Sequence, residues 1–216
     1  GRLGALQRVP IAYGARISGK IGSAWRLGVM TLRTAKIDSL GLPAQDYSVA
    51  VLQRRVLARS TLKPQILDVL ERHRGQAGII YCPSRKEVES LAQWLQDTGW
   101  RARPYHAGLP DDERHRNQDA FLNEEIDVMV ATVAFGMGID RSDVRFVIHA
   151  GAPQSLEHYQ QESGRAGRDG LEAECVLITS AADFLKWRAM LEKSGELSDA
   201  RRGLLRDMER YAASVG

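Results

Sequence analysis

The sequence predicts an α/β protein in which a mainly parallel sheet is covered by helices on both faces, over about residues 61–192. Short apolar runs typical of buried strands alternate there with segments of helical periodicity. The loops after four of these runs carry small, polar or basic residues, as binding loops at the carboxyl ends of parallel strands do. The helix before the fifth strand leads into two arginines, Arg165 and Arg168.

Each element follows from a local pattern. Apolar spacing predicts a helix over residues 63–74, and a continuous apolar run predicts a buried strand at Gly78–Cys82. Ser84 and Glu87 have the spacing of a capping box, which starts the next helix, and Gly99 closes it. The same reasoning gives strands at 101–106, 126–131, 144–149 and 173–179, and helices that begin near 110 and span 155–163, 181–192 and 195–216.

Charge is distributed unevenly along the chain. The 216 residues carry a net charge of +3, but residues 1–60 hold ten Lys or Arg against two Asp. This basic N-terminal segment, whose structure the sequence leaves uncertain, either contacts nucleic-acid phosphates or is a solvated, poorly ordered arm. Its run Gly14–Lys20 has the G-x-x-x-x-G-K spacing of a phosphate loop. However, Ile21 stands where a Mg²⁺-binding hydroxyl is required, so we interpret the run as a chance match.

The cysteines and the hydropathy pattern narrow the cellular setting. Cys82 and Cys175 are the only cysteines, and both lie in apolar runs. We expect two buried, reduced thiols rather than a zinc site, which indicates a reducing, cytoplasmic environment. The sequence contains no run of about 18 apolar residues, so no membrane span is predicted. The N-terminus lacks the apolar core of a secretory signal, although its basic, acid-poor composition also fits a transit peptide.

The arginine pair is the most informative motif. On a helix, Arg165 and Arg168 would share one face, and two parallel guanidiniums form a fork for phosphate oxygens. The small residues around them would leave room for a nucleotide polyphosphate. The alternative is a solvated helix end, which the spacing Gln161-x-x-Gly-Arg-x-Gly-Arg disfavours. Arginines placed in this way can stabilise the charge that develops on a transferred γ-phosphoryl group.

The strand-end loops have simpler explanations when each is taken alone. Their residues could be helix caps (Ser84, Asp140), turn residues (His106, Gly136, Gly138) or core side chains under a loop (Phe135, Met137). Convergence favours function, because all of them are expected on one rim of the sheet together with both arginines.

Four segments are far more specific when taken together: Gly78–Arg85, Tyr105–Leu109, Ala131–Asp140 and His158–Gly170. They resemble motifs IV, IVa, V and VI of the second motor domain of superfamily 2 helicases, and match most closely those of the RecQ family of DNA helicases. The spelling Phe-Gly-Met-Gly-Ile-Asp in the third segment is more specific than general helicase motifs, and DEAD-box RNA helicases usually spell it differently.

The resemblance implies a RecA-like sheet of the P-loop NTPase type and ATP-dependent, 3′ to 5′ DNA unwinding that uses ATP and Mg²⁺. It implies that Gln161, Arg165 and Arg168 face ATP held on another motor domain, with Arg168 favoured as the arginine finger. Gly138 and Asp140 would couple the state of ATP to the grip on DNA. The residues implied along the single strand are Ser84, Arg85, His106, Gly108, Thr132 and Met137.

The chain departs from the family in what it lacks. A true phosphate loop, an acidic Mg²⁺-binding motif and an aromatic-rich coupling loop are missing, and no cysteine follows Cys175 for the family's zinc-binding region. We therefore expect a fragment or one half of a split gene, with a helical extension at 193–216, that hydrolyses ATP negligibly alone. It would act with a first motor domain on single-stranded and branched DNA in replication, recombination or repair. Two alternatives stay open: a nucleic-acid-binding module without catalysis, and a DEAD-box-like RNA helicase half.

Overall fold

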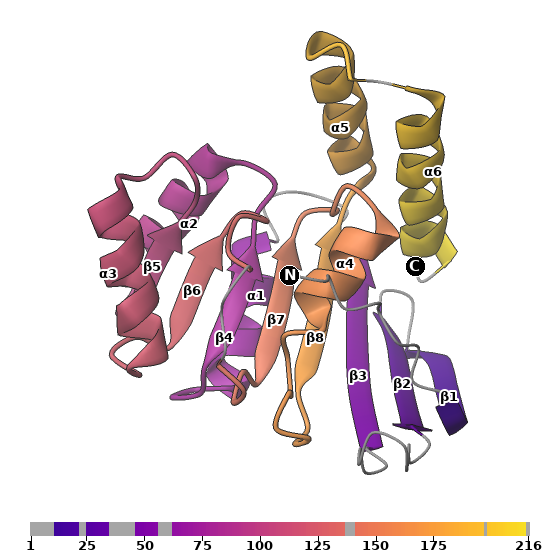
Figure 1. The fold of residues 1–216 in the computed structure, drawn as a ribbon, viewed down its shortest axis with the longest axis horizontal. Coiled ribbons are helices and arrows are strands. Elements are labelled where there is room, and N and C mark those ends of the chain that lie inside the picture. The colour runs from indigo at the N-terminus through magenta and orange to yellow at the C-terminus, as the bar shows by residue number, and fades with distance from the viewer. Residues whose placement is uncertain are drawn as a thin grey trace, which may run out of the picture.

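A single mixed sheet organises the protein. The computed structural model describes residues 11–21, 25–34, 46–55, 62–136, 141–196 and 198–214. Within these ranges, eight strands lie in the order β1-β2-β3-β8-β7-β4-β6-β5 (Figure 1). Neighbours from β3 through to β5 run parallel, so the mainly parallel α/β fold predicted from the sequence is confirmed. The strands are β1 Ile11–Ile21, β2 Trp25–Thr34, β3 Asp46–Arg55, β4 Gly78–Tyr81, β5 Ala102–Tyr105, β6 Val128–Ala131, β7 Phe146–Ala150 and β8 Glu174–Thr179.

The helices cover both faces of the sheet, because adjacent residues of a strand point to opposite sides. Ile80 of β4 packs with α1 and α2 on one face, whereas Ile79 packs with Phe121 of α3 on the other. Cys82 belongs to the first cluster and Cys175 to the second; both are buried, free thiols, as predicted. The helices are α1 Leu62–Arg72, α2 Arg85–Asp97, α3 Asp111–Leu122, α4 Leu156–Ser163, α5 Ala181–Lys193 and α6 Asp199–Ser214.

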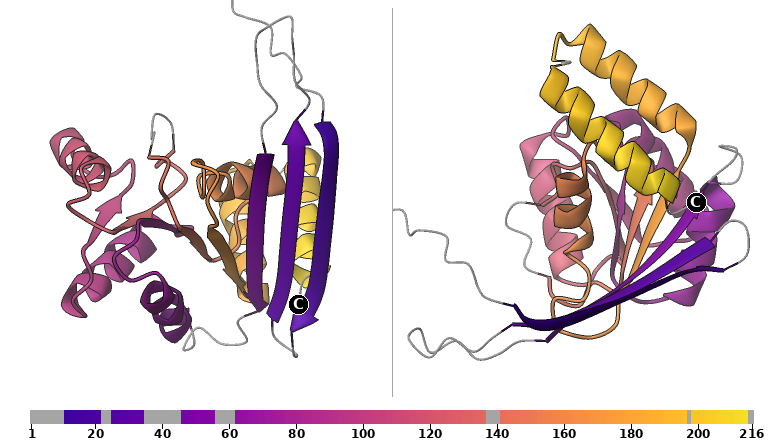
Figure 2. Two further views of the ribbon diagram at one scale, coloured as in Figure 1. Left: turned by 90° about the horizontal axis from the view of Figure 1, so that it is seen from below. Right: turned by 90° about the vertical axis from the view of Figure 1, so that its right-hand side faces the viewer.

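The first three strands were not predicted. β1 pairs with β2 and β2 with β3 in antiparallel fashion, and β3 joins the parallel part of the sheet beside β8. Figure 2 shows them as a long ribbon beside the rest of the sheet. The run Gly14–Lys20 lies inside β1, where its backbone pairs with β2. It therefore forms no phosphate loop, and its interpretation as a chance match is confirmed.

Two helices project beyond the carboxyl edge of the sheet, next to the end of β8 (Figure 1). Phe184 of α5 packs with Leu205 and Met208 of α6 in a third buried cluster. The indole N–H of Trp187 donates to the carbonyl oxygen of Ala152 at 2.7 Å, which ties α5 to the segment after β7. None of the helices that the structure describes has the length and apolar character needed to span a bilayer.

A charged cluster fixes the opposite, amino edge of the sheet. Glu174, the first residue of β8, accepts from Arg72 at 2.7 Å and lies 2.8 Å from Nε2 of His73. The hydrogen bond to Glu174 raises the pKa of His73. Burial alone would raise the pKa of Glu174, but its bonds to His73 and Arg72 outweigh burial, and the pKa is lowered. The cluster thus joins the end of α1 to the start of β8.

Candidate functional site

The loops predicted to bind a ligand do leave the sheet at a common edge. Tyr105, Ala131, Tyr81 and His149 are partners across the ends of β5, β6, β4 and β7, so the four following loops start side by side. Register alone therefore brings together five of the residues that the sequence assigned to a nucleic-acid track: Ser84, Arg85, His106, Gly108 and Thr132.

Within this carboxyl edge, Arg85 lies against bare backbone. A Cβ built on Gly108 would stand 2.9 Å from Nη1 of Arg85, which shows how closely the guanidinium approaches the loop after β5. His106 is buried: its Nδ1 accepts the N–H of Gly108 at 3.1 Å, and its Nε2 lies 3.1 Å from Glu89 without hydrogen-bond geometry. The ring thus supports the loop from beneath.

Two further residues of this edge have structural roles in their own loops. The hydroxyl of Ser84 accepts the N–H of Glu87 at 3.3 Å and so caps α2, which confirms its predicted place at the helix start. Thr132 is half-buried, and its Oγ1 accepts the N–H of Ala134 at 3.4 Å. Their contact with nucleic acid stays a prediction.

The arginine pair does not lie on a helix face, contrary to the expectation from its spacing. α4 ends at Ser163, with Gly164 as its C-cap, and Arg165 and Arg168 lie in the turns that follow. Gly167 is needed there for the backbone: its φ is +63°, and a Cβ would stand 2.7 Å from the carbonyl oxygen of Leu171. This glycine shapes the turn rather than clearing space for a ligand. We call residues 164–170 the arginine loop.

The arginine loop also lies apart from the carboxyl edge. The N–H groups of Gly167 and Asp169 donate to Val144 and Ser142, in the segment that leads into the amino end of β7. Arg145 of the same segment pairs with the Asp169 carboxylate, and the pKa of Asp169 is lowered by this bond. Because α4 runs back over the sheet from the carboxyl end of β7, the backbone of the arginine loop lies beside the segment that leads into β7. The predicted single rim is therefore an edge and an adjoining face, and the loop after β6 joins the two where Gly136 meets Arg165.

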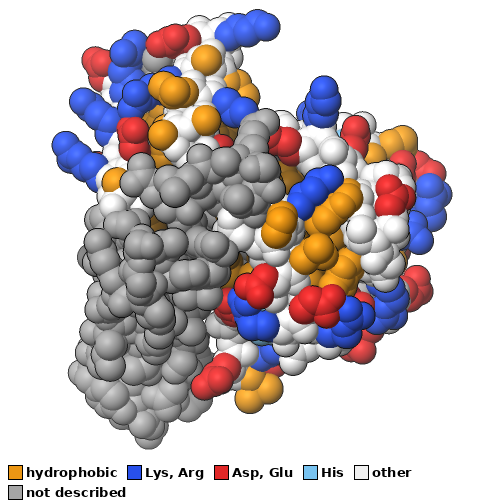
Figure 3. Space-filling model, turned by 180° about the vertical axis from the view of Figure 1, so that it is seen from behind, with side chains coloured by type: hydrophobic (Ala, Val, Ile, Leu, Met, Phe, Trp, Pro, Cys, Tyr) orange, Lys and Arg blue, Asp and Glu red, His pale blue; other side chains and the backbone are white. Residues whose placement is uncertain are grey.

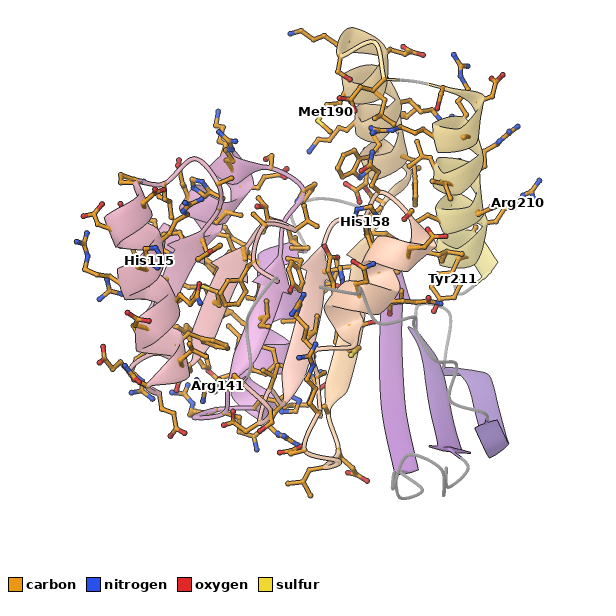
Figure 4. All side chains as sticks on the ribbon, in the orientation of Figure 1. His115, Arg141, His158, Met190, Arg210 and Tyr211 are labelled. Carbon is orange, nitrogen blue, oxygen red and sulfur yellow. The ribbon has the colours of Figure 1, made fainter. Side chains whose placement is uncertain are left out.

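The segment that carries the loop's partners is itself anchored. Arg141, labelled in Figure 4, lies over the ring of Phe121 with its guanidinium carbon 4.7 Å from the centroid. It donates to the Asp143 carboxylate at 2.8 Å and to the carbonyl oxygen of Phe121. The bond to Arg141 lowers the pKa of Asp143. The arginine loop thus rests on a segment held to α3.

Arg165 is seated on a glycine. A Cβ built on Gly136 would fall inside 3.0 Å of Nη2 of Arg165 and 3.1 Å from its Cζ, so a side chain at this position would displace the guanidinium. Phe135, next to this glycine, is buried and accepts the hydroxyl of Tyr81 on its carbonyl oxygen at 2.9 Å. Phe135 is therefore a core side chain under the loop, which confirms one of the two interpretations given from the sequence. From the sequence, Gly136 was expected either to be a turn glycine or to act as part of the segment that resembles motif V.

One donor atom of Arg165 is left unsatisfied by the part of the chain that the structure describes. The side chain is half-buried, and its Nε is buried without a hydrogen-bond partner among the described residues. Burial raises the pKa of the Tyr81 hydroxyl, and the charge of Arg165 beside it opposes that rise. Arg168 differs, since it is exposed and its Nε donates to the carbonyl oxygen of Gly164 at 3.3 Å. Gln161 is exposed on α4.

A buried hydrogen-bonded pair supports α4 from below, and no sequence pattern predicted it. Nε2 of His149 lies 2.8 Å from Oε2 of Glu162, and both side chains are buried. The His149 ring stacks on Tyr81, with centroids 5.5 Å apart, and contacts Tyr159 at 4.9 Å. A cavity of about 60 Å³ opens beside this pair and also reaches Thr132, so it connects the carboxyl edge with the base of α4.

The remaining predicted site residues and the larger cavity do not belong to the surface around the arginine loop. Met137, Gly138 and Asp140 lie outside the described residues. A larger cavity of about 480 Å³, with Ser84 and Ser180 in its wall, has Leu91 and Ile178 in its lining and so lies on the α2 side of the sheet, away from the arginine loop. Among the described residues, no three His, Cys, Asp or Glu side chains gather as a metal site would require.

Comparison with known proteins gives consistent similarities. Residues 62–170 match the model of the helicase conserved C-terminal domain. The chain is 50% identical over 127 residues to the ATP-dependent DNA helicase RecQ of Bacillus subtilis, and 48% identical over 130 residues to the RecQ-like DNA helicase BLM of Xenopus laevis. Each match covers 59% of this chain, but only 22% and 10% of those proteins. A DEAD box protein from Methanococcus jannaschii has a similar fold, with a TM-score of 0.55 at 24% identity, over 64% of this chain and 38% of that one.

Proposed function

The chain belongs to the family of helicase conserved C-terminal domains, in its RecQ branch, and from this premise we propose that it is the second motor domain of an ATP-dependent DNA helicase. The observation that carries the proposal is the seat of Arg165. A guanidinium held on bare backbone, with a buried Nε that lacks a partner among the described residues, is a cation prepared for an anion that comes from outside.

The anion is the polyphosphate of ATP bound to a first motor domain. Arg165 and Arg168 reach across the gap between the two domains and stabilise the charge that develops as the γ-phosphoryl group leaves. Gln161, exposed one turn before them, contacts the same nucleotide. Of the two arginines, the structure supports Arg165 as the pre-positioned one, while Arg168 is the more exposed, in keeping with the role of a finger that inserts into another domain's site.

DNA passes along the carboxyl edge. Arg85, on the bare backbone of Gly108, supplies a charged contact to a backbone phosphate, and loop N–H groups and hydroxyls supply the neutral ones. His106 acts from beneath, by holding its loop in place. Met137, Gly138 and Asp140 keep the roles that the resemblance implies. The protein is thus assigned to unwinding single-stranded and branched DNA with 3′ to 5′ polarity, in replication, recombination or repair.

Mg²⁺ accompanies ATP in such reactions, where it bridges the phosphates and neutralises their charge. The described residues do not suit it, because they offer no metal-ligating cluster. We therefore place both the ion and the phosphate cradle on the first motor domain. Residues 61–192 then form the motor domain and 193–216 a helical extension, and the two free, buried thiols support a place in the reducing cytoplasm.

The test is a hybrid in which residues 62–196 replace the corresponding region of Bacillus subtilis RecQ, to which this chain is 50% identical over 127 residues. We expect the hybrid to hydrolyse ATP in a DNA-stimulated manner. Arg165→Ala or Arg168→Ala should each lower kcat by about 1,000-fold, with a much smaller change in KM, because the lost interaction forms in the transition state. The isolated chain should show negligible hydrolysis.

The matched control is Arg116→Ala, which removes an exposed arginine of α3 that pairs with Asp112 at 2.8 Å, away from the arginine loop. Its kcat should equal that of the unaltered hybrid. Retention of full activity by Arg165→Ala and Arg168→Ala together would refute the proposal, as would a robust DNA-stimulated ATPase of the isolated chain. Competition of labelled single-stranded DNA with unlabelled RNA tests the substrate, since equal competition would favour an RNA helicase.

A further inference from the structure

A second basic site lies away from the arginine loop, in the pocket between α5 and α6. The pocket has a volume of about 240 Å³ and is lined by Arg188, Glu192, Arg202, Leu205 and Arg206. Leu205 is buried and closes the pocket toward the core. We call it the helix-pair pocket. No motif of the sequence and no part of the proposed function uses these residues.

The helix-pair pocket is preorganised but not neutralised. Arg188 is fixed by Glu209 of the other helix, with Nη2 2.6 Å from Oε2. Arg202 and Arg206 are one helical turn apart, and their side chains make no hydrogen bond or ion pair with other described residues. Like charges at this spacing repel each other. Counting both glutamates against three arginines, the pocket keeps an excess of one positive charge.

This arrangement suits a particular anion. Guanidinium groups bind phosphate oxygens through paired N–H donors, and two from successive turns can hold one phosphate between them. An excess of one positive charge matches a phosphodiester, which carries one negative charge, better than a free triphosphate, which carries several.

The pocket is also placed where a nucleic acid can reach it. α5 begins directly after β8 at the carboxyl edge, and the helix pair projects from the same side as the strand-end loops (Figure 1). Figure 3 shows Lys and Arg side chains gathered along the projecting pair. From these observations we propose that the helix-pair pocket binds a backbone phosphate of DNA, outside the motor motifs. The identity of the ligand rests on the proposed function, whereas the phosphate chemistry rests on the pocket.

The test measures DNA binding by the full chain. The probe is a fluorescein-labelled 20-base-pair duplex with a single-stranded tail, followed by anisotropy between about 50 and 200 mM salt. The double variant Arg202→Gln with Arg206→Gln should bind about tenfold more weakly at constant salt, since charged hydrogen bonds to one phosphate are lost. The slope of log affinity against log salt should become shallower by about 1.

A matched control keeps general electrostatics constant. Arg201→Gln with Arg210→Gln removes the same two charges from the same helix, but Arg201 pairs with Glu196 and Arg210 points away from α5 (Figure 4). Its affinity should fall less than twofold. Circular dichroism and thermal unfolding verify that both variants fold, as expected for exposed side chains.

Three results would overturn the proposal: equal losses in the two double variants, no loss in either, or no binding of the probe by the unaltered chain at 50 mM salt. Displacement of the Arg202- and Arg206-dependent binding by millimolar ATP would assign the pocket to a free polyphosphate and would also refute it. The outcome is separable from the proposed function. If the hybrid lacks ATPase activity while DNA binding by the full chain still depends on Arg202 and Arg206, only the motor assignment is refuted.

Discussion

The closeness of Gly136 to Arg165 makes one substitution unusually informative. Gly136→Ala places a Cβ inside 3.0 Å of Nη2 of Arg165, whereas ordinary contact begins at 3.4 Å. The guanidinium must therefore withdraw by roughly 1 Å. The backbone of Gly136 is not in the left-handed region, and the atom that must move is the end of a flexible side chain. The substitution should displace the arginine and little else.

The expected effect is large on activity and small on stability. A displacement of about 1 Å at a catalytic group costs about 100-fold in rate, and the loss of an arginine finger costs about 1,000-fold or more. Gly136→Ala should therefore lower the kcat of the RecQ hybrid by about 100-fold, less than Arg165→Ala does. The free energy of unfolding of the isolated chain, measured in urea, should change by no more than about 0.5 kcal/mol.

Controls make the comparison interpretable. Gly203→Ala is the same chemical change in α6, where a Cβ would meet nothing within 4 Å, and it should stabilise the isolated chain by about 0.5–1 kcal/mol. Arg116→Ala is again the control that should leave the kcat of the hybrid unchanged. Full activity of Gly136→Ala would refute the reasoning, because the position of Arg165 would then not matter. A loss of 2 kcal/mol or more would instead show that the glycine serves the fold.

Further outcomes follow from the buried and charged groups. Glu174→Gln should flatten the dependence on pH of the free energy of unfolding measured in urea. The lowered pKa of Glu174 contributes stability that is fully present above the unfolded pKa of 4.5 and is lost as the pH falls through the folded pKa. The raised pKa of His73 contributes stability that is fully present below the unfolded pKa of 6.5 and is lost as the pH rises through the folded pKa. An unchanged profile would contradict this. His149→Ala should cost about 3–5 kcal/mol of unfolding free energy, since it leaves the Glu162 carboxylate buried without its partner; a cost under about 1 kcal/mol would argue against the pair. Burial raises the pKa of Cys175 to about 12, so its reaction with a thiol reagent at pH 8 should be limited by unfolding, and labelling at the rate of a free thiol would disprove the burial.

The parallel part of the fold was predictable because its strands and helix starts are determined by residues close together in the sequence. A strand buried on both faces must be continuously apolar, so short runs such as Gly78–Tyr81 and Val128–Ala131 stand out between amphipathic helices. The start of α2 was equally readable, since the Ser84 hydroxyl satisfies an N–H three residues away. The errors at element ends are small for the same reason.

The unpredicted strands show where local patterns mislead. β1 contains alternating apolar residues at Ile11, Tyr13, Ile17 and Ile21, which is a strand signal, but the intervening glycines and its phosphate-loop spacing obscured it. Its pairing with β2 and β3 joins segments brought together only by the fold. In this region, therefore, the spacing of the sequence predicted neither a real binding motif nor the strands.

The site shows a similar division between chemistry and position. The arginine pair was found from its spacing, but its distance from the carboxyl edge depends on the direction and length of α4, which the motif does not contain. The pair of His149 and Glu162 joins residues 13 positions apart on a strand and a helix. Two such residues face each other only once both elements pack on the sheet, so no local pattern could reveal them.

The separation of edge and face has a consequence for how the two surfaces communicate. Residues 132–136 follow β6: the N–H of Thr132 donates to the carbonyl oxygen of Tyr105 at the carboxyl edge, and Gly136 lies beneath Arg165 on the face. Between these points Phe135 is fixed by its buried ring and by the Tyr81 hydroxyl. A guanidinium that leaves Gly136 to meet a phosphate, as proposed above, would uncover one end of residues 132–136, whose other end adjoins the proposed DNA track. Because this segment touches both surfaces, we predict that it carries the coupling between nucleotide and DNA.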